Sequence, residues 1–286
     1  MSFVLLSVLC SVLVSVLLKL ARRLEIDVAQ AIAWNYVIAS ALTALMLRPS
    51  LATLRQPGTP WLALIGLGVL LPTIFLVLGA SVRHAGIVRS DAAQRLSLVL
   101  SLLAAFVMFG QPLVALKLVG MALGLLALLC MVWRKDVHAA PTHRVAGWSY
   151  PLLVFAGFGC IDILLKRVAQ VGVPLGDSLQ AIFALALLVA FALQLVRRLR
   201  GQTRFTIRSA LGGLLLGLFN FGNILFYLQA HRALPHDPAL VFASMNVGVV
   251  GVGALVGLLL FRERLSRLNL AGVVLALLAV GVMAVG

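Results

Sequence analysis

The chain has 286 residues, of which 63% are hydrophobic and 11% charged, and its formal net charge at pH 7 is +15. A soluble domain has about a quarter of its residues charged, so this composition, with a mean hydropathy of +1.13, excludes an ordinary soluble globular protein. The 23 Lys and Arg residues are spread over short loops between apolar runs. That pattern indicates membrane topology and excludes a nucleic-acid-binding face.

Ten apolar segments follow one another along the chain, each close to the ~20 residues that a helix needs to cross a bilayer. Such segments must be helical, because open sheets cannot satisfy their backbone in lipid. Pro and Gly residues mark the joints between them. The predicted segments are 2–19, 28–48, 60–82, 86–109, 112–133, 148–170, 177–197, 208–231, 236–261 and 268–286.

Three sequence patterns recur in the same order about 150 residues apart. Asp27-Val-Ala-Gln30-Ala-Ile returns as Asp177-Ser-Leu-Gln180-Ala-Ile, at an offset of 150. Leu-Leu-Lys19 returns as Leu-Leu-Lys166 at an offset of 147. Phe-Gly-Gln111 returns as Phe-Arg-Glu263 at an offset of 152, and a Gly follows nine residues after each, at 120 and 272. These matches predict two repeats, 1–136 and 148–286, joined by a linker at 137–147.

Each repeat contains five predicted helices, so the second repeat enters the membrane from the opposite side. The sequence therefore predicts an all-α integral membrane protein of ten transmembrane helices, built as two inverted repeats. A solute site is expected between the repeats near the bilayer midplane.

The distribution of Lys and Arg predicts the orientation. Loops after the odd-numbered helices carry 16 of them, loops after the even-numbered helices carry 6, and Arg95 lies within the fourth helix. Because positive charge marks the cytoplasmic side, both termini are expected on the non-cytoplasmic side.

The chain resembles EamA-type members of the drug/metabolite transporter superfamily. The resemblance rests on the two five-helix repeats and on the junction into the last helix of each. That junction is Leu260-Phe-Arg-Glu263-Arg-Leu-Ser leading to Gly272, and Phe109-Gly-Gln111-Pro-Leu leading to Gly120. The first half has Gln111 where the family pattern has an acid, which favours a structural role for Glu263. The resemblance implies that helices 1, 3, 4, 6, 8 and 9 line a central cavity.

Polar residues inside the segments are the candidate substrate ligands, since polar groups are costly in lipid. Asp162 and Arg95 would give a cavity both signs of charge, which suits a zwitterion such as an amino acid. Alternatively, Asp162 forms an ion pair with Lys166, which can extend to the interface, and Arg95 pairs with Asp91. Repeat-related pairing and depth add the remaining candidates, although interhelical hydrogen bonding is an alternative for the asparagines. They are Ser15, Gln94, Asn220, Asn223 and Asn246.

A second group of residues is expected to be structural or to gate movement. Small residues at Gly-xxx-Gly spacing let helices approach closely, so the fifth and tenth helices are expected to pack against each other or against a partner at the periphery. Gly213-xxx-Gly217 and Gly253-xxx-Gly257 are instead expected to be sliding surfaces. The structural candidates are Lys19, Lys166, Glu263, Gly120, Gly124 and Gly272.

These patterns predict a bacterial inner-membrane transporter that exports a small polar metabolite by alternating access, as a monomer or homodimer in the lipid bilayer. No nucleotide-binding loop is present, and the three cysteines fit no metal motif, so we expect no cofactor or metal and coupling to a proton or to the solute gradient. A lipid-linked intermediate flippase of the same fold is an alternative. An integral-membrane enzyme is a weaker alternative, because the only cluster of acids and histidines in the sequence is His231, Arg232, His236 and Asp237.

Overall fold

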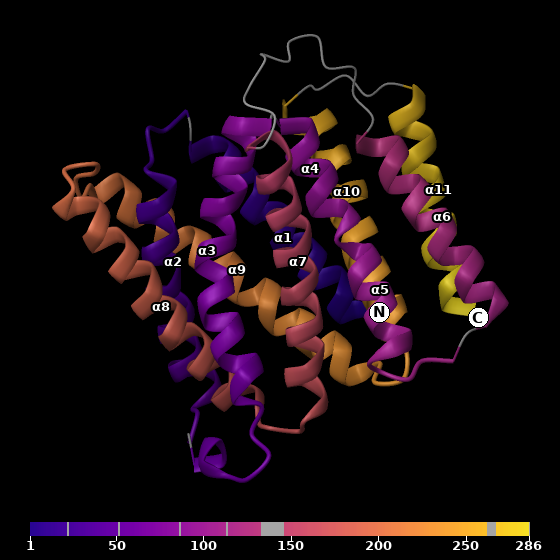
Figure 1. Cartoon of the computed structure of the whole chain (residues 1–286), viewed down its shortest axis with the longest axis horizontal. Coiled ribbons are helices and arrows are strands. Elements are labelled where there is room, and N and C mark those ends of the chain that lie inside the picture. Colours follow the sequence, from indigo (N-terminus) through magenta and orange to yellow (C-terminus); the bar gives the residue numbers. More distant parts are fainter. Residues whose placement is uncertain are drawn as a thin grey trace. The chain divides into compact units, whose positions relative to one another are not determined.

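The computed structural model describes the chain from Met1 to Val285, except for Arg22, Leu51, Gly86, Leu113 and the segments 133–145 and 262–266. Each of the ten predicted segments contains a helix, and the described residues form no β-strand (Figure 1). The protein is therefore all-helical over its described part, as the sequence predicts.

The observed helix boundaries lie within three residues of the predicted ones. In the first half the elements are α1 (Ser2–Ala21), α2 (Val28–Leu42), η1 (Thr43–Leu47), η2 (Ala52–Arg55), α3 (Trp61–Ala85), α4 (Ile87–Leu96), α5 (Leu98–Val107) and α6 (Ala115–Val132). In the second half they are α7 (Ala146–Gln170), α8 (Leu175–Leu199), α9 (Ile207–Ala233), α10 (Pro238–Phe261) and α11 (Arg267–Val285).

The predicted fourth helix, 86–109, is observed as α4 and α5, separated by Ser97. The Ser97 hydroxyl donates to the Gln94 carbonyl oxygen at 2.6 Å, and the Leu100 amide bonds to the Ser97 carbonyl. Serine side chains that bond back to the preceding turn bend helices. Since Ser97 keeps right-handed helical angles, the chain is locally distorted here and does not turn back.

Six helices of the described part are long and apolar enough to cross a membrane by length and composition. Shorter apolar helices occur at Ala93–Val107, Ala115–Ala127 and Leu270–Met283. These helices fit a protein embedded in a membrane. The six longer spans are Ser2–Ala21, Val28–Leu47, Trp61–Ser81, Leu175–Leu199, Ile207–Ala233 and Pro238–Leu259.

The chain forms two compact units that do not coincide with the two predicted repeats. Unit 1 combines Met1–Thr73 with Leu164–Ala233, and unit 2 combines Ile74–Ile163 with Leu234–Gly286. Each unit takes segments from both halves of the sequence. The division into inverted repeats stays a prediction about the sequence.

In unit 1, α9 packs against α1 and α2, and α2 also packs against α8. A Cβ atom added at Gly213 would lie 2.5 Å from the Ala31 carbonyl oxygen, and one at Gly217 would overlap the Asn35 carbonyl oxygen. The two glycines thus let the α2 and α9 backbones touch. A backbone contact inside one compact unit favours a fixed contact over the sliding surface expected from the sequence.

In unit 2, α6 and α11 pack closely along their length, as predicted (Figure 1). A Cβ atom at Gly120 would lie 3.1 Å from the Ala279 carbonyl oxygen, and one at Gly124 would lie 3.7 Å from the Ala279 Cβ. Gly272 is buried in α11. Small residues therefore permit the close approach of these two helices.

Candidate functional site

Asp27 fixes the beginning of α2. Its Oδ1 atom accepts hydrogen bonds from the backbone amides of Ala29 at 2.9 Å and Gln30 at 3.3 Å. The first amides of a helix have no intrahelical partner, and an aspartate just before the helix satisfies them. Asp27 is therefore the N-cap of α2.

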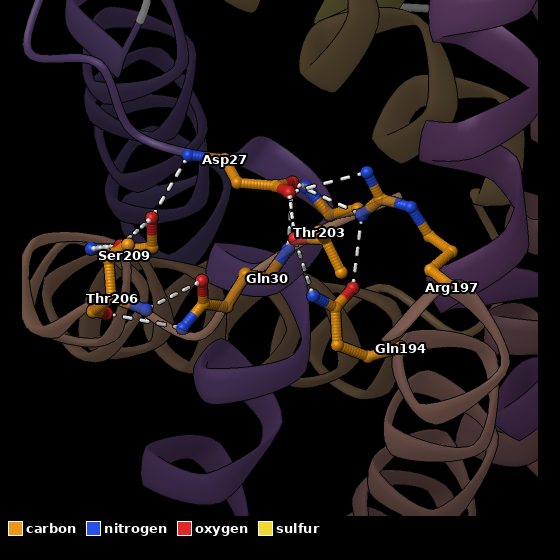
Figure 2. A network of polar contacts seen from close by, with 8 residues as sticks. Asp27, Gln30, Gln194, Arg197, Thr203, Thr206 and Ser209 are labelled. Atoms are coloured by element: carbon orange, nitrogen blue, oxygen red, sulfur yellow. Dashed lines mark hydrogen bonds and ion pairs between the residues drawn. The ribbon is translucent and has the colours of Figure 1, made fainter. Parts of the chain in front are cut away.

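The same carboxylate also binds the far end of α8 (Figure 2). Arg197 donates from Nη1 to Oδ1 and from Nη2 to Oδ2, both at 3.2 Å, and the Thr203 hydroxyl donates to Oδ2 at 2.7 Å. A bidentate arginine fixes a carboxylate in orientation as well as in charge. Asp27 thus joins the start of α2 to the end of α8 and to the loop that leads into α9.

A second layer of hydrogen bonds surrounds this carboxylate. Gln30 Nε2 donates to the Thr206 carbonyl at 3.1 Å, and the Thr206 amide donates to Gln30 Oε1 at 3.2 Å. The Ser209 hydroxyl accepts from the Asp27 amide, and Arg197 donates to Gln194 Oε1 (Figure 2). We call this set the Asp27 network. Its members are Asp27, Gln30, Gln194, Arg197, Thr203, Thr206 and Ser209.

The surroundings of Asp27 favour its charged form. Burial acts to raise the pKa of Asp27, but the hydrogen bonds from Arg197 and Thr203, the charge of Arg197 and the Gln30 amide together lower it. The folded state therefore prefers the carboxylate more strongly than the unfolded chain does.

We predict that this preference makes the protein sensitive to acid. A lowered folded pKa gives stability that is complete above the unfolded value of about 3.9 and is lost as pH falls through the folded value. Thermal unfolding, followed by circular dichroism in detergent between about pH 6 and pH 3, should show the melting temperature of Asp27→Asn falling less than that of the wild type. Glu25→Gln, at an exposed carboxylate, is the control. Equal pH slopes in the wild type and Asp27→Asn would contradict the prediction.

Asp177, the repeat mate of Asp27, makes the corresponding contact at the other end of the helix pair. The Ser50 amide and hydroxyl donate to its carboxylate at 3.0 and 3.2 Å, and the Thr53 hydroxyl donates to Oδ2. Thr53 and Thr203 are separated by the same 150 residues as Asp27 and Asp177. Asp177 is 2% exposed. We call Asp177, Ser50 and Thr53 the Asp177 network.

The two networks lie at opposite ends of α2 and α8. One joins the start of α2 to the end of α8, and the other joins the start of α8 to the chain just after η1. This connectivity requires α2 and α8 to run antiparallel. The repeated glutamines follow the same scheme, since Gln180 Nε2 donates to the Ser40 hydroxyl at 2.7 Å while Gln30 binds Thr206.

Four predicted substrate ligands belong to unit 2, namely Gln94, Arg95, Asp162 and Asn246. Asp162 is half-buried in α7, and its Oδ2 atom accepts a hydrogen bond from the Ser101 hydroxyl of α5 at 2.8 Å. Gln94 and Arg95 are half-buried in the last turns of α4, just before the distortion at Ser97. Asn246 Nδ2 donates within its own helix to the Phe242 carbonyl at 3.0 Å.

The other three predicted ligands belong to unit 1. Asn223 of α9 accepts a bond from the Ser7 hydroxyl of α1 at 2.9 Å, which is the interhelical bonding named as an alternative. Asn220 is buried. Ser15 is exposed, and its hydroxyl donates to the Ser11 carbonyl of its own helix. Substrate contact by these residues stays a prediction.

The predicted framework residues differ in their surroundings. Lys19 is exposed, whereas Lys166 is completely buried in unit 1 near His231. Tight packing around the end of α7 explains this difference, because the neighbouring Leu165 and Val168 are buried as well. Glu263 and the side chain of Asp91 lie outside the described residues.

Gln111 has a clear structural role in unit 2. Its Oε1 atom accepts a hydrogen bond from the Ala239 amide in the first turn of α10, at 2.9 Å. Lys117 of α6 forms an ion pair with Asp237, which directly precedes α10. The junction before α6 therefore holds the start of α10. Of the predicted enzyme cluster, Asp237 is in this ion pair and His231 is buried.

The described residues contain no group of three or more His, Cys, Asp or Glu side chains that could hold a metal ion. Ser101, Arg197, Thr53 and Thr203 are contacts that sequence reasoning missed. The threonines could have been found, because they repeat at the offset of the aspartates that they bind. Ser101 has no such signal.

No family model matches the chain. The crystal structure of a protein with 16% sequence identity has a TM-score of 0.76, covering 99% of this chain and 97% of that chain. This similarity shows a shared fold. An uncharacterized protein of Haemophilus influenzae is 40% identical over 284 residues, which is 97% of this chain and 95% of that protein. At this identity and coverage, the chain belongs to the same family as the Haemophilus influenzae protein.

Proposed function

We propose that the protein is a bacterial inner-membrane transporter of the drug/metabolite superfamily, which exports a small polar metabolite such as an amino acid. In this proposal two inverted five-helix repeats surround a midplane cavity, and alternating access is coupled to a proton or to the solute gradient. Both termini lie on the non-cytoplasmic side, and the protein acts without a cofactor and without chemical conversion of its solute.

The observation that carries the proposal is the pair of repeat-related contacts, Asp27 with Thr203 and Asp177 with Thr53. Each aspartate binds the loop that follows the partner helix of the other repeat. Two halves that exchange equivalent contacts at opposite ends of an antiparallel helix pair are what an inverted repeat produces. Inverted repeats are a recurrent architecture of secondary transporters, with substrate sites near the midplane between them.

The polar residues of unit 2 support a charged or zwitterionic solute. Asp162 and Arg95 supply opposite charges on α7 and α4, and ionisable residues in membrane helices commonly mark solute or proton pathways. The hydrogen bond from Ser101 orients the Asp162 carboxylate. In this proposal Asp162 binds the amino group of the solute, and Arg95 binds its carboxylate.

The first experiment is a thermal-shift screen of the purified protein against amino acids, amines and nucleosides, because a ligand that binds only the folded state raises the melting temperature. Any hit is then tested for movement across proteoliposomes. We expect Asp162→Asn and Arg95→Gln each to weaken binding of the hit and to reduce its transport rate by at least roughly tenfold, from the loss of a charge-assisted hydrogen bond. The melting shift at the same ligand concentration should therefore be smaller. Arg200→Gln removes an exposed charge at the end of α8 and is the control.

One result would contradict the proposed binding residues, and another would contradict the proposed function. If binding and transport of a hit are unchanged in Asp162→Asn and Arg95→Gln, these two residues do not bind the solute. Movement of a fluorescent lipid-linked sugar, without movement of any soluble candidate, would favour the flippase alternative.

A further inference from the structure

Unit 1 has a groove between the turn that joins α1 to α2 and the first turns of α9. Its volume is about 590 Å³, within the ~300–1,000 Å³ typical of ligand pockets. It is lined by Arg23, Leu24, Glu25, Ile26, Arg208, Leu211, Gly212 and Leu215.

The wall formed by the turn has a defined backbone shape. The Ile26 amide bonds to the Ala21 carbonyl at 3.0 Å, and Glu25 has a φ of 53°. A six-to-one bond with a left-handed residue before its donor is the arrangement that ends many helices. A Cβ atom at Gly212 would lie 2.7 Å from Ile26 Cδ1, so the glycine lets the turn approach α9.

The groove changes from charged to apolar along α9. Arg208, Leu211 and Leu215 are spaced by three and four residues, which places them on one face of the helix. Leu211 is 61% exposed and Leu215 is 46% exposed. Arg208 therefore begins a stripe whose next members are exposed leucines, extending over about 10 Å of helix.

The charged residues of the groove are two arginines, Arg23 and Arg208, and one acid, Glu25. Arg208 lies 3.7 Å from Glu25, and both side chains are more than three-quarters exposed. An exposed pair of this kind contributes little, so Arg208 is able to bind another anion. Arg23 adds a second guanidinium to the same groove.

We propose that this groove binds one anionic phospholipid, with its phosphate on Arg23 and Arg208 and an acyl chain along Leu211 and Leu215. A basic group beside an apolar stripe complements a lipid and not a free phosphate, which would leave the leucines uncovered. This proposal rests on one part of the proposed function, namely that the protein is embedded in a membrane with the turn between α1 and α2 on the cytoplasmic side. It does not depend on transport. Basic pockets between membrane helices on the cytoplasmic side bind anionic headgroups in this way.

The test is native mass spectrometry of the full chain in detergent, titrated with phosphatidylglycerol, phosphatidylcholine or inorganic phosphate. We expect phosphatidylglycerol to bind with a smaller apparent Kd than phosphatidylcholine, and inorganic phosphate to leave the bound lipid in place. Each arginine near an anionic surface contributes about 1 kcal/mol, so Arg23→Gln with Arg208→Gln should weaken binding roughly 30-fold. Glu25→Gln should tighten it by roughly two- to fivefold, because it removes the competing carboxylate.

The matched control is Arg198→Gln with Arg200→Gln, which removes the same charge from the end of α8, outside the groove. Weakening by the control equal to that by the groove variant would overturn the proposal, as would no tightening in Glu25→Gln. Displacement of lipid by inorganic phosphate would assign the groove to soluble anions instead.

This experiment is separate from the transport assay. Lipid binding without solute transport would contradict the proposed function but not the lipid site. Transport without selective lipid binding would contradict only the lipid site.

Discussion

Among Gly→Ala substitutions at the described glycines of unit 1, Gly217→Ala should destabilise the protein most. The new Cβ atom would overlap Ile38 Cγ2 and the Asn35 carbonyl oxygen of α2. A side chain such as Ile38 can change rotamer, but a carbonyl oxygen moves only if the whole helix moves. The α2 and α9 helices would have to separate along their contact.

We expect Gly217→Ala to lower the free energy of unfolding by roughly 2–4 kcal/mol, which is at or above the usual cost of overpacking. Gly213→Ala should behave similarly, because its Cβ atom would lie 2.6 Å from Trp34 Cβ as well as close to the Ala31 carbonyl. The measurement is reversible unfolding in mixed micelles of increasing sodium dodecyl sulfate content, followed by circular dichroism.

Gly251→Ala is the matched control, since it makes the same chemical change inside α10 and nothing lies within 4 Å of its added Cβ atom. Alanine favours a helix over glycine by up to about 1 kcal/mol, so this variant should be as stable as the wild type or slightly more so. Equal stability of Gly217→Ala and Gly251→Ala would show that α2 and α9 do not touch through their backbones.

The helices could be predicted closely from the sequence because the bilayer fixes their length. An apolar run near 20 residues bounded by Pro, Gly or charged residues has few alternatives in lipid. The prediction of 28–48 for the second helix differs from α2 and η1 by a single residue. The distortion at Ser97 was not predictable, because it depends on which backbone oxygen one hydroxyl binds.

Contacts between helices were less predictable, because these helices are apolar on nearly every face. An amphipathic helix shows which side is buried, but α10 has glycines and aliphatic residues all around it. The bond between Ser101 and Asp162 depends on the rotation of α5 and α7 about their axes, which no periodicity fixes. The burial of Lys166 has the same origin.

The internal repeat is the sequence pattern that predicts most about the observed contacts, but it does not distinguish a functional aspartate from one that caps a helix. Asp27 and Asp177 served to align the two halves and were not selected as a site, since each lies at a helix start where a cap is the expected role. Their partners, Thr203 and Thr53, lie in short polar segments between the long helices, where there is little local pattern. A search for polar residues that repeat at an offset of 150 would have found both pairs.

Double-mutant cycles at the two networks should give similar coupling energies if the contacts are equivalent. Asp27→Asn keeps a good N-cap for α2, because asparagine caps helices about as well as aspartate, and yet it removes the charge that binds Arg197 and Thr203. Asp177→Asn removes the charge that binds Ser50 and Thr53. Each variant should lose about 1.5–3 kcal/mol, the usual contribution of a hydrogen bond to a charged group.

Thr203→Val and Thr53→Val complete the cycles, since valine has nearly the shape of threonine without its hydroxyl. Residues in contact commonly couple by about 0.5–3 kcal/mol, and we expect the Asp27–Thr203 and Asp177–Thr53 couplings to have the same sign and to agree within about 1 kcal/mol. The measurement is the same detergent unfolding that is used for the glycine variants.

The cross pair is the internal control. Asp27 and Asp177 lie at opposite ends of a helix pair about 30 Å long at 1.5 Å per residue, so their single effects should add within about 0.5 kcal/mol. Coupling in one cycle alone would mean that the two networks are not equivalent, and the support that they give to an inverted repeat would be lost. Coupling in both cycles with additivity between them would mean that each end of the α2–α8 pair is held independently by the same chemical device, which is the arrangement an inverted duplication leaves behind.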